Sequence, residues 1–375
     1  MEALEKYFNE KKCTRIFLKY RWNKKVTCPY CGSENIIFYG KYERYFHRYL
    51  CKDCTSKNKK RTLFNDKTWT IFEGTKLSLS KWFLAGYLMK LDLSNKRISE
   101  ELGVEENTAS RICNLMRGSM FFQNCFNKLS GTVEMDEVYQ TAGSKGNGRN
   151  TREGNKSKGI RKNLGRKPRK RGLKIKGRGS YRKDKPPVIG MVERESGTIH
   201  LEITRNVTKD TVKPIAEGHI KKGSMVYTDE YSVYDFLQSS GYSHESVNHS
   251  AGEYARGDVH INTQEGIWSL FRPAVEAGRG VSKERLPLYT ASFEFFRNVK
   301  KRGEDALEEL IKTCLKAPAK GLLNLERNLV PPLLCPKYER NKLLKWGQGV
   351  RASLPLKGNV IKLVCRAFTL KDNDL

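Results

Sequence analysis

The strands expected in the middle of the chain come from runs in which apolar and polar residues alternate. Residues 132–139 read TVEMDEVY, and residues 187–193 and 198–203 form two further runs around a turn. Short strands are also expected at 224–229 and 244–249. Because helical segments separate several of these strands, the pattern predicts an α/β domain in which helices cover a mixed sheet.

Helices are expected where apolar residues recur every three or four positions. The helices expected after the first strand span residues 211–220, 231–240, 262–277, 282–302 and 305–315. We assign the sheet and its helices to a domain at 130–302, and the role of the tail at 303–375 is left open.

A helical region at 63–129 precedes the strands. Ser80 is expected to cap a helix that contains the apolar run Trp82–Met89. Residues 93–103 and 104–117 then predict two helices joined by a turn, which is the pattern of a helix-turn-helix.

The second helix of a helix-turn-helix enters the major groove of DNA. Asn107, Thr108 and Arg111 lie near the start of this helix and are therefore candidate DNA contacts. Plain packing of a helical hairpin is the alternative, because many small helical proteins share the pattern.

Four cysteines form two close pairs in the first part of the chain, at 1–62. Cys28 and Cys31 are separated from Cys51 and Cys54 by 19 residues, a spacing typical of two zinc knuckles joined by a hairpin. The sequence therefore predicts a structural zinc ribbon, with chance pairing of buried cysteines as the alternative. The other cysteines lack such spacing and are expected to be small buried hydrophobes; they are Cys13, Cys113, Cys125, Cys314, Cys335 and Cys365.

The charge of the chain indicates a polyanionic partner. There are 71 Lys and Arg residues against 41 Asp and Glu residues, which gives a formal net charge of +30. Composition alone also allows a ribosome-associated or RNA-coating protein.

Membrane and secreted classes are not expected. The longest apolar run, Trp82–Met89, is far shorter than the roughly 20 residues that span a bilayer. The first residues, MEALEKYFNEKK, lack the apolar core of a signal peptide. We expect a cytoplasmic protein associated with the nucleoid, or a nuclear one in a eukaryotic host.

More than half of the excess charge lies in an insertion after the first strand. Residues 144–187 carry 18 basic and 2 acidic side chains, among them Lys170 and Arg171. This insertion is too poor in apolar residues to fold alone, and we expect its basic side chains to contact DNA phosphates. A solvated loop without such a role is the alternative.

Three acidic residues lie where distant parts of the sheet are expected to meet. Asp136 is on the first strand, Asp229 ends a later strand, and Glu265 begins the helix at 262–277. Oxygen ligands that converge in this way suit Mg²⁺ or Mn²⁺, and two such ions can promote phosphoryl displacement.

These motifs together resemble insertion-sequence transposases of the DDE type, in the group that joins an N-terminal zinc ribbon to a ribonuclease H-like domain; Merlin transposases are similar. The segments that carry the resemblance are CPYCGS at 28–33, CKDC at 51–54, FNDKTWTIFEGTKLSLSKWF at 64–83, VEMDEVY at 133–139, VYTDEYSVY at 226–234 and HSAGEYARGDVHINTQEGIWSLFR at 249–272. The resemblance implies a ribonuclease H-like fold and a metal-dependent DNA transposase.

The resemblance also implies roles for single residues. Asp136 and Asp229 match the first two catalytic acids, and Glu265 is favoured as the third because a carboxylate is the stronger metal ligand. Asn262, one helical turn earlier, is the alternative third residue. Arg272 resembles the basic residue that follows the catalytic Glu and contacts DNA, although many relatives carry Lys there.

The expected function is therefore recognition of double-stranded element ends, metal-dependent strand cleavage and strand transfer into target DNA. Pairing of two ends implies at least a dimer in the DNA complex. A structure-specific nuclease of the same fold and a non-catalytic regulator derived from a transposase are the alternatives.

Overall fold

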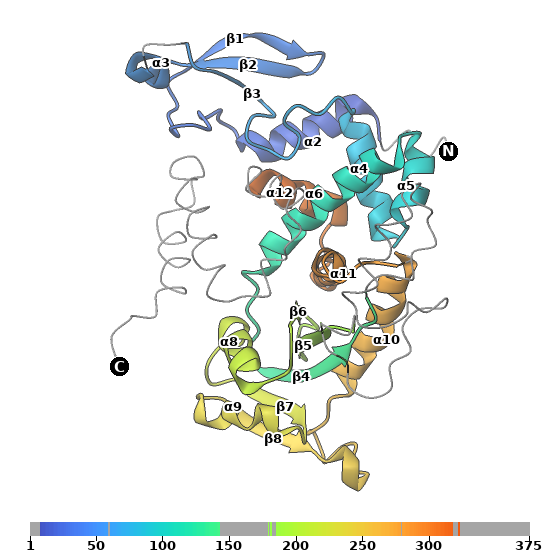
Figure 1. Cartoon of the computed structure of the whole chain (residues 1–375). Helices are drawn as coiled ribbons and strands as arrows, with labels where there is room; N and C mark the ends of the chain where they lie inside the picture. The colour runs from blue at the N-terminus through green and yellow to red at the C-terminus, as the bar shows by residue number, and fades with distance from the viewer. Residues whose placement is uncertain are drawn as a thin grey trace, which may run out of the picture. The chain divides into compact units, whose positions relative to one another are not determined.

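The structure is a computed structural model that divides into two compact units (Figure 1). It describes residues 8–58, 61–142, 179, 181, 185–278, 280–317 and 322. Unit 1 comprises Met1–Gln123, Glu304–Asn328 and Cys335–Leu375, and unit 2 comprises Asn124–Gly303 and Leu329–Leu334. Nearly all of the basic insertion, including Lys170 and Arg171, lies outside the described residues, as do Cys335 and Cys365.

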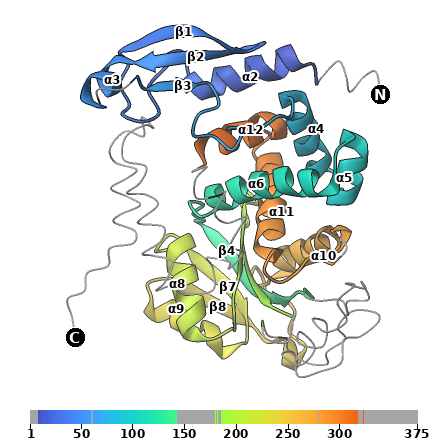
Figure 2. The ribbon, with the colours of Figure 1, turned by 45° about the horizontal axis from the view of Figure 1, so that its top comes forward.

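Unit 1 begins with a helix and a small sheet (Figure 2). The elements are α2 (Glu10–Trp22), β1 (Ile36–Glu43), β2 (Phe46–Cys51), α3 (Lys52–Asn58) and β3 (Leu63–Asn65). The strands form an antiparallel sheet in the order β1-β2-β3. Helix α2 was not expected from the sequence, and it buries Cys13 and Phe17 while most of its surface stays polar.

The remaining helices of unit 1 include the predicted helix-turn-helix. They are α4 (Leu79–Lys90), α5 (Asn95–Leu102), α6 (Glu106–Asn124) and α12 (Ala306–Lys316). Gly103 ends α5 in the left-handed conformation, with φ of 60°, and α6 starts three residues later. Helix α12, from the tail, packs against α2 and α4.

Two expectations for single residues are wrong: the residue that caps α4 and the burial of Cys125. The cap of α4 is Ser78, not Ser80, because the Ser78 hydroxyl accepts the hydrogen bond from the Lys81 amide. Cys125 is exposed, whereas Cys13, Cys113 and Cys314 are buried as expected. Cys125 follows the last residue of α6, where the chain leaves the packed helix.

Unit 2 contains a mixed five-stranded sheet in the order β6-β5-β4-β7-β8 (Figure 1). The strands are β4 (Thr132–Tyr139), β5 (Pro187–Glu193), β6 (Ile199–Ile203), β7 (Met225–Asp229) and β8 (Ser243–Val247). Strands β4, β5 and β6 pair antiparallel, whereas β7 lies parallel to β4 and β8 lies parallel to β7. The predicted mixed α/β fold is confirmed, and its strand order is consistent with a ribonuclease H-like domain.

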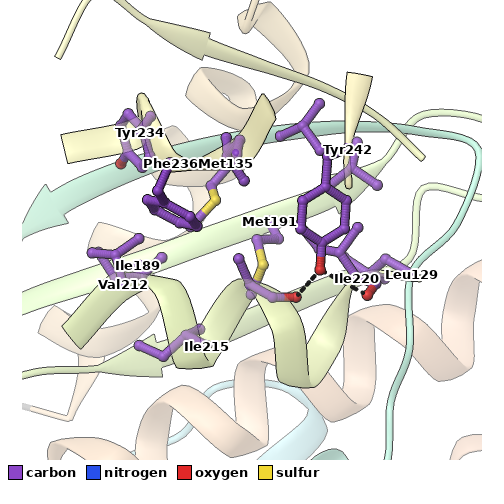
Figure 3. Packing of buried hydrophobic residues seen from close by; sticks show 14 of the residues in the cluster. Leu129, Met135, Ile189, Met191, Val212, Ile215, Ile220, Tyr234, Phe236 and Tyr242 are labelled. Atoms are coloured by element: carbon purple, nitrogen blue, oxygen red, sulfur yellow. Dashed lines mark hydrogen bonds between the residues drawn. The ribbon is translucent and has the colours of Figure 1, made fainter. Parts of the chain in front are cut away.

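Helices cover both faces of this sheet. On one face, Met135, Ile189 and Met191 pack against α8 (Lys209–His219) and α9 (Phe236–Ser239), and the Tyr242 hydroxyl donates to backbone carbonyls of α8 and its end (Figure 3). The other face is covered by α10 and α11; these are Asn262–Ala277 and Leu286–Lys301.

The predicted helix at 231–240 is instead two short pieces, η2 (Ser232–Tyr234) and α9. The residues Val233, Tyr234, Phe236 and Leu237 are all buried. Their spacing fits one face of a helix, which is why the sequence predicts a single helix where the chain forms two short pieces.

Strand β6 lies at one edge of the sheet, and helix α11 packs against it. The Asn298 side chain bonds both backbone groups of Ile199, and the Glu294 carboxylate accepts from the Leu201 amide at 3.0 Å. These side chains satisfy backbone groups that would otherwise offer a site for pairing with another strand.

Across the residues that the structure describes, no helix combines the length and the apolar character needed to cross a membrane.

Candidate functional site

The two predicted aspartates lie on neighbouring parallel strands, Asp136 within β4 and Asp229 at the end of β7. The register pairs Glu134 of β4 with Tyr227 of β7, and Asp136 and Asp229 each lie two residues further along. Parallel neighbours in this register bring the two carboxylates to the same edge of the sheet.

A third acid, Glu137, joins this pair, and the sequence reasoning missed it. Ligand oxygens of Asp136, Glu137 and Asp229 lie within 4.8 Å of one another. Glu137 follows Asp136 directly, so its side chain leaves the opposite face of β4, where the Tyr234 hydroxyl donates to it at 2.8 Å. The sequence signal that could have identified Glu137 was its position directly after Asp136 on the same predicted strand.

Burial and like charge make Asp136 a weak acid. Burial, together with the nearby Glu137 and Asp229 carboxylates, raises the pKa of Asp136 to about 7. The indole N–H of Trp268 donates to Asp136 Oδ2 at 2.8 Å and opposes this shift. A cation between the carboxylates would relieve the repulsion that raises the pKa.

Glu265 lies on α10, near the pair but outside the group of carboxylates within 4.8 Å that the described residues form. Trp268, three residues later on the same side of the helix, reaches Asp136. Glu265 is exposed, and so are Asn262 and Arg272, which lie one turn before it and two turns after it. One exposed stripe of α10 therefore carries all three residues.

The first turn of α10 is attached to β4 by a buried carboxylate. Glu134 is fully buried, and its Oε2 accepts from the Gln264 amide at 2.9 Å. Its Oε1 pairs with Arg194 Nε at 2.5 Å. Alternation along β4 places Glu134 and Asp136 on the same face of the sheet.

Gly190 allows α10 to approach the sheet closely. It lies opposite Asp136 in the pairing of β4 with β5. A Cβ at this position would collide with the side chains of Gln264 and Trp268. The contact between Trp268 and Asp136 thus depends on a residue without a side chain in the neighbouring strand.

The four predicted zinc ligands form one cluster in unit 1. The Sγ atoms of Cys28 and Cys54 are 3.8 Å apart, those of Cys31 and Cys51 are 3.6 Å apart, and all four lie within 4.8 Å. Zinc–sulfur bonds of about 2.3 Å place the sulfur atoms of a tetrahedron roughly 3.8 Å apart. The cluster therefore fits a structural zinc ion.

The candidate DNA contacts of unit 1 lie at the start of α6. Asn107 and Arg111 are exposed one turn apart, and Thr108 is half-buried beside them. The neighbouring Ala109 and Ile112 are buried, so one face of the helix packs in the core while the face with Asn107 and Arg111 is exposed.

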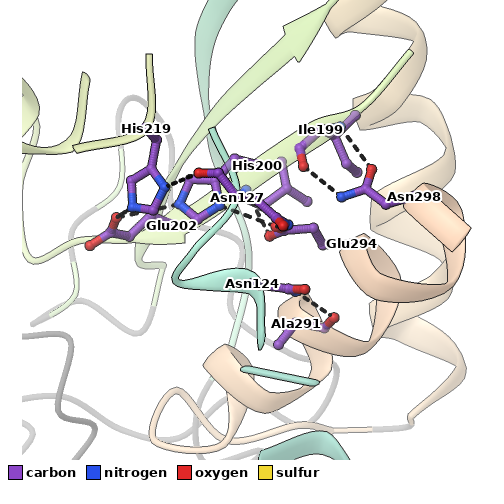
Figure 4. A network of polar contacts seen from close by, with 10 residues as sticks. Asn124, Asn127, Ile199, His200, Glu202, His219, Ala291, Glu294 and Asn298 are labelled. Carbon is purple, nitrogen blue, oxygen red and sulfur yellow. Dashed lines mark hydrogen bonds and ion pairs between the residues drawn. The ribbon is translucent and has the colours of Figure 1, made fainter. Parts of the chain in front are cut away.

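A second cluster of possible ligands, formed by His200, Glu202 and His219, has a structural explanation (Figure 4). The two imidazole rings stack with centroids 3.6 Å apart and planes within 15° of parallel. Nearly parallel rings cannot direct both lone pairs at one ion. Glu294 and Glu202 outweigh the effect of burial and raise the pKa of His200 to about 10, so a charged His200 balances these carboxylates.

Comparison with known proteins agrees with this architecture. Residues 128–298 match the model of an ISXO2-like transposase domain, and residues 8–57 match a transposase zinc-ribbon domain. An uncharacterized protein in transposable element ISH50 of Halobacterium salinarum is 36% identical over 318 residues, which cover 84% of this chain and 100% of that protein. An uncharacterized transposase-like protein of Haemophilus influenzae is 30% identical over 119 residues, or 31% of this chain and 96% of that protein.

A mixed ribonuclease H-like sheet with acids at its edge, joined to a zinc ribbon, defines the class of DDE transposases. The chain belongs to the ISXO2-like transposase family. Membership implies that it binds DNA.

Proposed function

We propose that this chain is an active transposase that cuts DNA at the ends of its element and joins those ends to target DNA. The observation that carries the proposal is the proximity of Asp136 and Asp229 on two neighbouring parallel strands, beside the helix that holds Glu265. An acidic centre in a chain of net charge +30 is suited to metal-dependent work on a polyanion.

The donor set supports Mg²⁺ or Mn²⁺ at this centre. All the acidic side chains involved offer hard oxygen ligands, and no cysteine belongs to the group. Asp136, Asp229 and Glu265 would hold the ions, with Asn262 as the alternative to Glu265. When bound, two such ions activate the attacking oxygen and stabilise the leaving oxygen of an in-line displacement.

Neighbouring side chains orient two acids of the group, Asp136 and Glu137. The Trp268 indole fixes one oxygen of Asp136, and the Tyr234 hydroxyl fixes Glu137 on the other face of β4. Water first attacks a phosphodiester at the element end, and the bond to the leaving 3′-oxygen breaks to free a 3′-hydroxyl. That hydroxyl then attacks a phosphodiester of target DNA, and the bond from the phosphorus to the target's 3′-oxygen breaks, leaving a 3′-hydroxyl on the target strand. Neither step needs a covalent bond to the protein.

DNA binding is divided among several surfaces in this proposal. Asn107, Thr108 and Arg111 read the element end together with the zinc ribbon, and Arg272 contacts DNA beside the active site. The basic insertion, with Lys170 and Arg171, holds phosphates without regard to sequence. Pairing of two ends requires two copies of the chain in the complex.

The proposal is tested by incubating the full chain with labelled element-end DNA, a target plasmid and Mg²⁺. The wild-type chain should give both cleaved and joined products, and chelation of Mg²⁺ should abolish them. Asp229→Asn should lower cleavage at least about a hundredfold, since it removes a charged ligand. Asp210→Asn, at an exposed position in the first turn of α8, is the matched control.

Cleavage without joining would instead support a structure-specific nuclease. DNA binding without metal-dependent cleavage would contradict the proposal and support a regulator.

A further inference from the structure

Glu134 is a buried acid that the proposed chemistry does not use. It lies on β4 two residues before Asp136 and has no exposed surface. A buried carboxylate is costly unless it is paired and hydrogen-bonded, so its contacts indicate its role.

The first contact is with the beginning of α10. Glu134 Oε2 accepts from the Gln264 amide, one of the amides in the first turn that has no partner within the helix. Among the described side chains, none of α10's own residues caps this end, because Ile261 stands at the N-cap position. Glu134 therefore supplies from β4 the acceptor that a capping side chain normally gives.

The second contact is with Arg194, which fixes the loop before α10. Arg194 donates to the carbonyl oxygens of Asp258 and His260, each at 2.7 Å, while its Nε pairs with Glu134. The same guanidinium lies 4.7 Å from the ring centroid of Tyr227 on β7. One ion pair thus connects β4, β7 and the segment that enters α10.

We propose that Glu134 is a positioning residue, whose carboxylate holds the first turn of α10 so that Glu265 stays beside Asp136 and Asp229. The inference rests on the proposed function, because it assigns the placement of the third catalytic acid. Glu265 is the residue after Gln264, so a shift of the anchored amide moves the attachment of the Glu265 side chain directly. The Trp268 contact fixes the next turn and leaves the first turn to Glu134.

Two double variants separate positioning from stability. Removing one member of a buried ion pair destabilises a protein, whereas replacing both members by side chains of similar size is close to neutral. Glu134→Leu with Arg194→Met removes the acceptor for the Gln264 amide. Glu134→Gln with Arg194→Met keeps a carbonyl acceptor at the same place, and both pairs lose Arg194 equally.

The measurements are thermal unfolding, cleavage of element-end DNA, and the Mn²⁺ concentration that gives half-maximal cleavage. The Leu variant should unfold at a somewhat lower temperature than the Gln variant, because the buried Gln264 amide loses its acceptor, and both should be folded at the temperature of the assay. The Leu variant should cleave about 10–100-fold more slowly and need correspondingly more Mn²⁺, as is usual when a residue that orients a metal ligand is lost. The Gln variant should recover most of the wild-type rate and Mn²⁺ requirement.

Equal rates and equal Mn²⁺ requirements in two folded double variants would overturn the inference. If either double variant fails to fold, Glu134→Gln alone, which keeps the acceptor for the Gln264 amide, is compared with Glu134→Met alone, which removes it, and equal Mn²⁺ requirements would overturn the inference as well. An inactive wild-type chain would contradict the proposed function instead, so the two failures are distinguishable.

Discussion

Side chains of β4 point alternately to the two faces of the sheet, and acids on both faces make specific hydrogen bonds. Glu134 and Asp136 face α10, where they bond the Gln264 amide and the Trp268 indole. Glu137 faces the other helical layer and bonds Tyr234. Both faces of one strand thereby support a single acidic centre.

The contact between Trp268 and Asp136 gives a prediction for pH dependence. Trp268→Phe keeps an aromatic ring in the core but removes the hydrogen bond that lowers the pKa of Asp136, so that pKa should rise above about 7. Because the ionised carboxylate binds the metal, the rising limb of the pH–rate profile should move to higher pH. At pH 7 the rate should fall about tenfold, equivalent to roughly 1.4 kcal/mol.

The check is the pH profile of DNA cleavage at limiting Mg²⁺, with thermal unfolding as the control for folding. An unchanged rising limb would mean that this hydrogen bond does not tune Asp136.

Some residues of the candidate site could be predicted from the sequence, and others could not. Asp136 and Asp229 could be predicted because one lies on a predicted strand and the other ends a later one, and because both fall in segments that resemble the family. The anchoring role of Glu134 could not, because alternation identifies the face of a strand and not the helix that packs on it. The stacked pair of His200 and His219 likewise depends on a contact between β6 and α8 that local patterns do not contain.

Regular elements with strong periodicity were predicted most accurately. Strand β4 and helix α10 have the predicted bounds, 132–139 and 262–277. The segment at 231–240 was predicted less well, because its apolar residues have helical spacing but the chain forms two short pieces there. Helix α2 was missed since its polar surface hides the few residues that it buries.

The close approach of α10 to the sheet gives a prediction at the scale of elements. Gly190→Ala should push α10 away from β5 and destabilise the protein by about 1–3 kcal/mol, the usual cost of overpacking. DNA cleavage should fall with it, because Trp268 would lose its place beside Asp136. Denaturant unfolding and the cleavage assay measure the two effects.

Gly266→Ala is the matched control on α10 itself. A Cβ there meets open space, so the change should stabilise the helix by up to about 1 kcal/mol. Gly190→Ala with wild-type stability would show that the helix can move without cost.

Charge is distributed unevenly over the whole molecule. The insertion at 144–187 carries 18 basic side chains, while the acidic centre is assembled from β4 and β7. In the proposed function the basic insertion holds a polyanion and the acidic centre cuts it. The sequence left the role of the tail open, and its helix α12 packs against α2 and α4 in unit 1.

The basic insertion gives a prediction for the whole molecule. Deletion of 145–185 should flatten the salt dependence of DNA binding, because each lost phosphate contact lowers the slope of log K against log salt by about 0.9. Lys170→Gln with Arg171→Gln should lower that slope by at most about 2. Binding measured over a series of salt concentrations provides the slopes, and identical slopes would exclude the insertion from the DNA interface.

The central claim is that Asp136, Asp229 and Glu265 form one catalytic set on DNA. The most direct test compares Glu265→Gln with Asn262→Ala in the cleavage and joining assay, with Glu276→Gln at an exposed position of the same helix as the control. Glu265→Gln should abolish cleavage, Asn262→Ala should reduce it only mildly, and Glu276→Gln should leave it unchanged. An inactive Asn262→Ala variant beside an active Glu265→Gln variant would contradict the account.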